Sequence, residues 1–233
     1  MVKTKGGIYV ATEQSQNRLE QSVKNQLYAQ AKKLFYEKGY NDTYLSEITA
    51  GLNMHKTSIT YHFGTKTKLA SKVISEYVAS YSALIDEKLT QKFGQAELHL
   101  SAALRYIVFL NALEQDPNVR RFYIEYTTAN PINVYNAPSV SLIKQFNEKY
   151  NLGLDEKKIS LIAIANYSTY PALVITYFSN KANFDLKDVI EYKVKLLFEL
   201  LHMPSDFIEK TYQTSKKLFE EFNFIYKPYF VVE

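Results

Sequence analysis

Residues 54–69, MHKTSITYHFGTKTKL, decide the fold, because they have the pattern of a short basic and aromatic helix followed by the start of another helix. Met54, Ile59 and Phe63 recur at spacings that place them on one buried face. The opposite face carries small polar groups, an amine and a phenol, which suit a nucleic-acid groove. This stretch therefore predicts the second helix of a helix-turn-helix.

Two helical patterns precede this stretch. Apolar residues over 23–35 recur every three or four positions, and Gly39 stands where a left-handed glycine closes a helix. Thr43 is expected to cap a second, shorter helix, with Glu47 in its first turn, where negative charge suits the helix dipole. Asn53 tolerates positive φ and is expected to make the turn before the third helix.

The predicted third helix, residues 55–63, directs several polar side chains outward. Lysine and threonine can meet base edges, and hydroxyl groups can donate to phosphate oxygens. Thr65 is expected to cap a fourth helix. Lys66 at its first position favours a docked anion, since a lone cation at a helix N-terminus is unfavourable. The candidate DNA-binding residues are Ser46, His55, Lys56, Thr57, Ser58, Thr60, Tyr61, His62 and Lys66.

At these residues the chain resembles the tetracycline-repressor (TetR) family of bacterial transcriptional regulators, over roughly residues 21–77. The resemblance rests on AKKLFYEKGY (31–40), LSEIT (45–49) and ITYHFGTKTKL (59–69). It implies a homodimer with one recognition helix per subunit. It also implies a variable helical C-terminal domain that binds an inducer, and repression that this ligand relieves.

The resemblance also assigns roles within the third helix. It implies that Lys56, Thr57 and Thr60 face bases. Three positions depart from the family's common pattern, because Asn53 replaces the turn glycine, His55 replaces the serine cap and Thr60 replaces a tyrosine. The fold is expected to survive these changes, but the operator sequence cannot be carried over from a relative. The residues implied to face or support the phosphate backbone are Ser58, Tyr61, His62 and Lys66.

The charge of the chain is unevenly distributed. Residues 1–72 hold eleven Lys and Arg against five Asp and Glu, a net charge of +6. Residues 73–233 hold seventeen against nineteen, a net charge of −2. A solvated lysine face is the plain alternative. Because the positive charge coincides with the motif, it favours a DNA-contact domain.

Length and composition favour a folded protein in which three regions are expected. We expect residues 1–20 to form a flexible arm and residues 21–72 to form a helix-turn-helix DNA-binding domain. We expect residues 73–233 to form a helical effector-binding and dimerisation domain. The absence of cysteine excludes disulfides and thiol-based metal or redox chemistry. No N-terminal apolar run with a cleavage site is present, so a cytoplasmic protein is predicted.

The pattern beyond residue 65 predicts an all-α fold. A helix over 66–93, ended by Gly94, is long enough to join the DNA-binding head to the second domain. Residues 96–113 are apolar nearly all round and predict a central buried helix. Further helices are predicted after Asp116, where proline follows the cap, and then at residues 140–150, 159–178, 186–201 and 205–224.

The segment 159–180 contains no charged residue and is long enough to consider as a membrane span. Polar residues and a proline dilute its hydrophobicity, and no flanking basic cluster accompanies it, so we predict no membrane partner. The lack of charge is better explained if one face of this helix packs in the core and the other packs against a second subunit. The resemblance implies a four-helix dimer bundle made by residues 159–178 and 186–201 of each subunit.

Twenty tyrosines and fourteen phenylalanines make the chain rich in aromatic residues. Tyrosine pairs an apolar ring with one hydroxyl group, which suits a pocket for a flat or lipophilic effector. Plain core packing is the alternative for each of them. The candidate effector-binding residues are Tyr77, Tyr81, Tyr106, Phe109, Phe122, Tyr126, Tyr167 and Tyr170.

No motif predicts an enzyme. The chain has no G-x-S-x-G, phosphate loop, dinucleotide fingerprint or H-E-x-x-H, and its four histidines lack metal-ligand spacing. Neither a catalytic site, a metal site nor a cofactor is therefore predicted. Arg121 and Glu125 stand four positions apart and are expected to pair on a solvated helix face.

Two interpretations of the function remain. The first is a dimeric repressor that a small-molecule effector releases from a palindromic operator. The second is a DNA-bound regulator whose C-terminal domain binds a protein partner. A cavity of some hundreds of Å³ in the C-terminal domain would favour the first interpretation. A contiguous apolar patch outside the dimer interface would favour the second.

Overall fold

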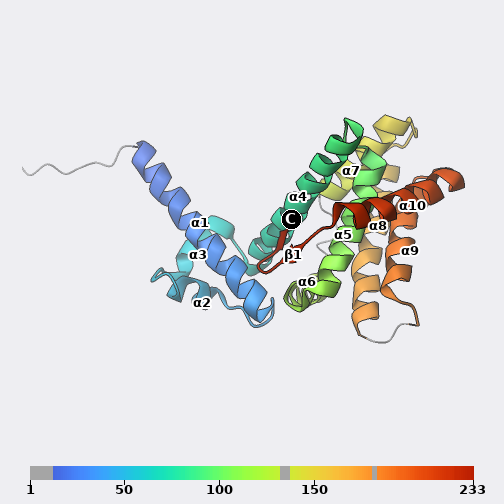
Figure 1. Ribbon diagram of the computed structural model, residues 1–233. Coiled ribbons are helices and arrows are strands. Elements are labelled where there is room, and N and C mark those ends of the chain that lie inside the picture. The colour runs from blue at the N-terminus through green and yellow to red at the C-terminus, as the bar shows by residue number, and fades with distance from the viewer. Residues whose placement is uncertain (1–12, 132–136, 180–182) are drawn as a thin grey trace, which may run out of the picture.

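The computed structural model describes residues 13–131, 137–179 and 183–233, which form the predicted all-α fold. Helices α1–α3 make a head, and α4 runs from this head into a body made with α5–α10 (Figure 1). Two short antiparallel strands end the chain, with Tyr226 opposite Val232. The elements are α1 (Glu13–Lys38), α2 (Leu45–Ala50), α3 (Lys56–Phe63), α4 (Lys66–Phe93), α5 (Leu98–Gln115), α6 (Pro117–Ala129), α7 (Ala137–Tyr150), α8 (Glu156–Phe178), α9 (Leu186–Leu200), α10 (Ser205–Phe222), β1 (Tyr226–Lys227) and β2 (Val231–Val232).

The head has its own small core, to which each of its helices contributes. Leu27 and Phe35 of α1, Ile48 of α2, Ile59 of α3 and Leu69 of α4 are all fully buried. Burying one such side chain stabilises the fold by about 1.5–3 kcal/mol. The apolar residues that recur in the sequence are therefore the ones that pack α1, α2 and α3 together with the start of α4.

The first helix starts earlier than expected. α1 begins at Glu13, so residues 13–20 continue the helix and do not belong to an arm. The remainder of the expected arm, residues 1–12, lies outside the described residues. The local cause is composition, since residues 13–20 contain neither glycine nor proline and the helix can extend through them.

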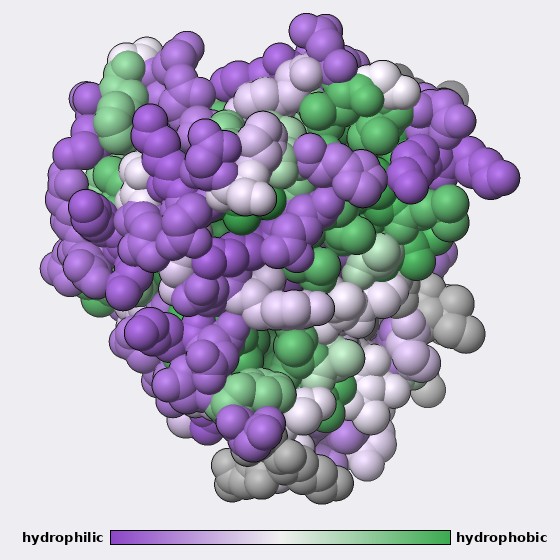
Figure 2. All heavy atoms as spheres, turned by 90° about the vertical axis from the view of Figure 1, so that its right-hand side faces the viewer, coloured by the Kyte–Doolittle hydropathy of each residue, from purple (hydrophilic) through white to green (hydrophobic). Residues whose placement is uncertain are grey.

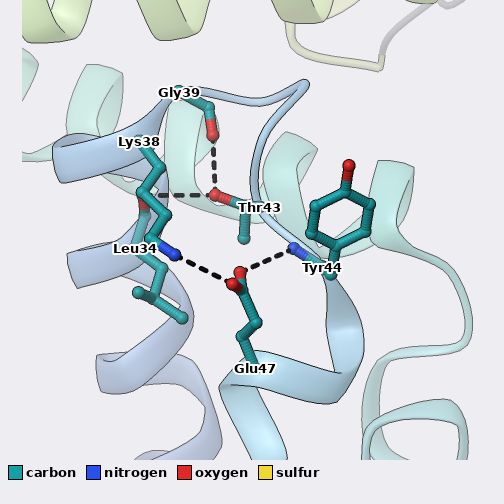
Figure 3. A network of polar contacts seen from close by, with 6 residues as sticks. All are labelled: Leu34, Lys38, Gly39, Thr43, Tyr44 and Glu47. Carbon is teal, nitrogen blue, oxygen red and sulfur yellow. Dashed lines mark hydrogen bonds and ion pairs between the residues drawn. The ribbon is translucent and has the colours of Figure 1, made fainter.

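The junction between α1 and α2 is closed by polar contacts (Figure 3). Gly39 has φ of 83°, as its predicted role requires. The buried Thr43 hydroxyl donates to the carbonyl of Gly39 at 2.7 Å and to that of Leu34 at 3.2 Å, so Thr43 closes α1 and does not cap α2. The first turn of α2 is held by Glu47, whose carboxylate accepts from the Tyr44 amide at 3.3 Å.

The body is organised around α5, as the sequence predicts. This helix packs against α4, α6, α9 and α10. Ala103, Leu104, Ala112 and Leu113 on it are fully buried. The predicted cap of the next helix is also confirmed, since Asp116 Oδ1 accepts from the Asn118 and Val119 amides at 2.9 and 3.2 Å.

Helix α6 holds the head against the body. Phe122 of α6 packs on Phe35 of α1 with ring centroids 5.1 Å apart. Arg121 Nη2 donates to the Glu37 carbonyl at 2.7 Å, at the end of α1, and the Glu125 carboxylate accepts from the Asn41 amide at 2.8 Å. The predicted pair between Arg121 and Glu125 is therefore wrong, because both side chains bind the head instead.

The C-terminus does not end in the expected helix. α10 stops at Phe222 instead of 224, and residues 226–232 form the hairpin of β1 and β2 beside α4 (Figure 1). Phe230 in this hairpin contacts the rings of Tyr36, Tyr77 and Phe122, with centroids 5.6, 5.7 and 5.2 Å apart. The hairpin therefore joins α1 of the head to α4 and α6.

Helix α8 has a buried side and an apolar exposed side. Leu161 and Ile164 on α8 are 55% and 40% exposed, and Tyr192 on α9 is 52% exposed. Figure 2 looks onto the end of the body that carries α9 and α10, and apolar side chains are exposed there among hydrophilic ones. By length and composition alone, α8 is also apolar enough to cross a membrane, a test that core helices of soluble proteins pass as well.

Candidate nucleic-acid interface and aromatic cluster

Helix α3 packs against the head on its inner side and is exposed on its outer side. Its inner side is anchored by Ile59, which is fully buried, and by Phe63, whose ring lies 6.4 Å from that of Tyr28 on α1. The turn before it is made by Asn53 with φ of 54°, as predicted, and is closed by the Met54 amide, which donates to the Thr49 carbonyl at 3.0 Å. These contacts position α3 while its outer side stays accessible.

The predicted DNA-binding side chains are distributed between exposed and half-buried positions. Tyr61 on α3 is accessible, with 74% of its surface exposed. The side chain of Lys56 lies outside the described part of the structure. Exposed positions are Ser46, His55, Thr57, Thr60 and Tyr61, and half-buried positions are Ser58, His62 and Lys66.

Tyr61 has a neighbour that the sequence reasoning missed. The carboxylate of Glu20, on the first part of α1, hydrogen-bonds with the phenol and raises its pKa above the ordinary value. Tyr61, His62, Glu20 and Lys24 line the same cleft between α1 and α3. Because residues 13–20 were expected to form an arm, nothing in the sequence reasoning placed a carboxylate beside α3.

Lys66 lies at the N-terminus of α4, as predicted. Thr65 caps this helix, since its hydroxyl accepts from the Lys68 amide at 3.1 Å. The Lys66 ammonium donates to the Asn41 carbonyl at 3.2 Å and lies 4.4 Å from the centre of the Tyr40 ring. The loop between α1 and α2 thus orients this cation near the positive end of the helix dipole, a place that also attracts phosphate.

Seven of the eight predicted effector-binding residues come together in an aromatic cluster. In the middle of the cluster, Phe109 lies 6.2 Å from Tyr81 and 5.7 Å from Tyr170 between ring centroids. Tyr123, which was not predicted, packs edge-on against Phe109 at 5.1 Å. Further ring contacts among its members extend the cluster to Tyr77, Tyr106, Phe122, Tyr126 and the hairpin residue Phe230. Tyr167 is half-buried on α8, and no ring contact joins it to the described cluster.

These rings lie in the core of the body. Burial raises the pKa of the Tyr81, Tyr123 and Tyr170 phenols well above the ordinary value. A cleft of about 570 Å³ opens elsewhere in the body, and none of the eight predicted residues lines it. This cleft is more polar than the aromatic effector pocket that the sequence predicts. Its polar lining residues are Asp86, Ser101, Arg105, Gln145, Glu148 and Lys149.

Comparisons with known proteins concern the head most directly. Residues 27–73 match the family model described as bacterial regulatory proteins of the tetR family. The HTH-type transcriptional repressor BdcR of Escherichia coli (strain K12) is 27% identical over 124 residues, which span 48% of this chain and 63% of BdcR. The chain thus covers less than two thirds of this curated relative.

A solved structure described as a gamma-butyrolactone receptor (ArpA-like protein) aligns with a TM-score of 0.41 and 18% identity. The alignment covers 87% of this chain and 99% of that one. The family match, in contrast, confirms the resemblance stated from the motifs, so the head is a helix-turn-helix domain of the tetR type. Both matched descriptions name regulatory proteins.

Proposed function

We propose that this chain is a cytoplasmic, dimeric transcriptional repressor that binds a palindromic operator and is released by a small-molecule effector. The observation that carries this proposal is the geometry of α3. Ile59 and Phe63 anchor the helix, while Thr57, Thr60 and Tyr61 stay exposed on a tetR-type head. A short helix fixed in this way can enter the major groove without rearranging the head.

Two kinds of contact follow from this arrangement. Thr57 and Thr60 are short enough to approach base edges, and the threonine methyl group can meet that of thymine. Tyr61, His62 and the Lys66 ammonium at the end of α4 are suited to the phosphate backbone. Glu20 beside Tyr61 repels phosphate, so the phenol has to exchange its carboxylate partner for a phosphate oxygen on binding.

Replacing Lys66 and Thr60 in turn should distinguish a contact that positions the protein on the phosphate backbone from one that recognises the base sequence. Lys66→Met keeps an apolar stem over Tyr40 but removes the charge, so it should weaken specific and nonspecific DNA alike. The slope of log affinity against log salt should become shallower by about 0.9 per lost phosphate contact, and by about two in a dimer. Thr60→Ala should relax the preference at one symmetric pair of positions and cost about 1–3 kcal/mol per half-site, with the slope unchanged.

Fluorescence anisotropy over a salt series measures both effects. Lys217→Met is a matched control, because it removes one exposed lysine from α10, in the body. Our assignment of the DNA-facing surface is wrong if Lys66→Met and Lys217→Met give the same affinity and slope as the parent chain.

The apolar exposed side of α8 supports the dimer. Leu161 and Ile164 would be covered if α8 and α9 of two subunits formed a four-helix bundle. A two-fold axis through such a bundle gives two α3 helices, one for each half of a palindrome. The same exposed residues are what a protein partner would use, so the second interpretation predicts a different occupant for this face.

The contacts between head and body support control by an effector. α4 passes through both parts, and α6 holds α1 through Phe122, Arg121 and Glu125. An effector that prefers a body in which these contacts shift would lower DNA affinity by its differential affinity for the two states. Such coupling is usually about 1–3 kcal/mol, or about 5- to 150-fold.

A fractionated cytoplasmic extract can decide between the two interpretations. The small-molecule fraction should lower operator affinity by about 5- to 150-fold, and the effect should persist after proteins are removed by filtration. The control is the isolated protein with an equal volume of filtered buffer. If only the retained protein fraction changes operator binding, the chain is regulated by a protein partner and the effector proposal fails.

A further inference from the structure

Lys193 of α9 is buried inside the body, with 1% of its surface exposed. Its ammonium donates to the backbone carbonyl of Asn166 and to Asn166 Oδ1, the latter at 2.7 Å, and lies 3.4 Å from Thr169 Oγ1. The ring centres of Tyr106 and Tyr170 are 4.9 and 5.7 Å from Nζ. Lys193 therefore lies where α5, α8 and α9 meet.

The groups that contact this ammonium are all neutral. Lys195, two residues further along α9, pairs with Glu191 and Glu209 at 2.7 Å each. Lys193 takes part in no ion pair within the described part of the chain. An isolated buried charge is unfavourable, and burial lowers the pKa of Lys193 to about 7. The body thus buries an amine that has no anion beside it to keep it charged.

A second buried group next to Lys193 also lacks a partner. Tyr170 is 8% exposed, and its hydroxyl has no hydrogen-bond partner among the described residues. The neighbouring Tyr106 hydroxyl differs, because it accepts from Asn166 Nδ2 at 2.8 Å. A buried hydroxyl left without a partner destabilises the fold, because it has lost its hydrogen bonds to water. An acceptor near Tyr170 would remove that cost.

We propose that the effector is an organic acid whose carboxylate pairs with Lys193 and accepts a hydrogen bond from the Tyr170 hydroxyl. This inference rests on the proposed function, since it names the chemical class of the effector. One carboxylate supplies both an anion that lets Lys193 take up a proton and an acceptor for the Tyr170 hydroxyl. Phe109 and Tyr123 pack on the Tyr170 ring, so a flat carbon skeleton would lie against these aromatic side chains once α8 moves to admit it.

Pro171 provides a way to admit such a ligand. It follows Tyr170 inside α8, and a proline has no amide hydrogen to donate to the Tyr167 carbonyl one turn earlier. The helix is therefore weakened next to Lys193 and can bend there. Because the exposed side of the same helix is the proposed dimer face, a bend at this position would also alter the spacing of the two heads.

Benzoate and benzamide test the proposal, since they share a shape but only benzoate carries a charge. Calorimetric titration of the full chain without DNA, at pH 8 in two buffers of different ionisation enthalpy, gives both affinity and proton exchange. Benzoate should bind with uptake of about one proton per chain, because pairing recharges a lysine that is mostly neutral at this pH. Benzamide should bind much more weakly and without proton uptake.

Matched variants assign the effect to the buried lysine. Lys193→Met should lower benzoate affinity by about 30-fold or more and abolish proton uptake, while Lys195→Met on the same helix should change neither. Tyr170→Phe should keep the proton uptake but lower affinity by several-fold. Circular dichroism and sedimentation should show that each variant remains folded and assembled like the parent chain.

Each result decides the inference. Absence of benzoate binding at millimolar concentration, equal binding of benzamide, or unchanged benzoate binding by Lys193→Met would each overturn it. Operator binding by the ligand-free chain is measured separately and tests the proposed function. A chain that binds its operator and responds to an extract but not to benzoate is a regulator whose effector is not this type of acid.

Discussion

Leu161→Arg should convert the dimer into a monomer and lower operator affinity by about 100- to 10,000-fold. Leu161 is 55% exposed in the single chain and lies on the side of α8 that we propose to be covered in the dimer. A guanidinium placed in an apolar interface keeps its desolvation cost without gaining a partner. Loss of the second head removes the avidity of two linked contacts, which is typically worth a factor of this size.

Sedimentation at micromolar concentration measures the first part of this effect. The parent chain should give about twice 27.0 kDa and Leu161→Arg about 27.0 kDa. Ile225→Arg is the matched control, because it places the same charge on an apolar residue that is 51% exposed between α10 and β1, outside the proposed interface. A Leu161→Arg chain that sediments and binds DNA like the parent would exclude α8 from the dimer interface.

The stability of the chain should depend on pH through Lys193. Its folded pKa is lowered to about 7 from the ordinary value of 10.5, so between these values the unfolded chain holds a proton that the folded chain lacks. The free energy of unfolding should therefore rise with pH relative to Lys193→Met, by up to about 1.4 kcal/mol per pH unit. Below pH 7 both states are protonated, and the difference should become constant.

Urea unfolding of both chains at pH 6, 7.5, 8.5 and 9.5 measures this difference. The titratable groups beside Lys193 are Tyr106 and Tyr170, whose folded pKa values are raised above the ordinary value, so they stay protonated in this range. Taking the difference from Lys193→Met removes contributions that the two chains share. Parallel stability curves for the two chains would mean that Lys193 is charged in the folded protein throughout this range.

The head could be predicted from sequence because its signals are local. Ile59 and Phe63 share a face by spacing alone, and Asn53 and Gly39 adopt the positive φ that few other residues tolerate. Thr43 was assigned wrongly for the same reason. The prediction that Thr43 caps α2 considered only the residues next to it. In the folded head the Thr43 hydroxyl instead donates to the carbonyl of Leu34, nine residues earlier.

The contacts between head and body could not be predicted in this way. The four-residue spacing of Arg121 and Glu125 indicates a pair on one helix, but the unsatisfied carbonyls at the end of α1 are better acceptors for a guanidinium. Phe230 reaches Tyr36 across almost the whole length of the sequence. No periodic pattern in residues 226–232 indicates which earlier helices this hairpin meets.

Lys193 illustrates a signal that was present but not used. On α9 it stands four residues after Val189 and four before Leu197, both buried, so spacing alone places it on the buried side. Lysine is usually exposed, and the sequence reasoning gave it no role. Most of the residues predicted to bind an effector do lie near one another, but they are packed together in the core. Core packing was the alternative interpretation of these aromatic residues.

Selection of bound sequences from a random duplex library, followed by native mass spectrometry of the selected complex, tests the central claim most directly. The account predicts an inverted repeat, with half-sites about one helical turn or a multiple of it apart, bound by two chains per duplex. Thr60→Ala should alter the enrichment at one symmetric pair of positions within that repeat. Enrichment of an asymmetric site bound by a single chain, or no enrichment at all, would contradict it.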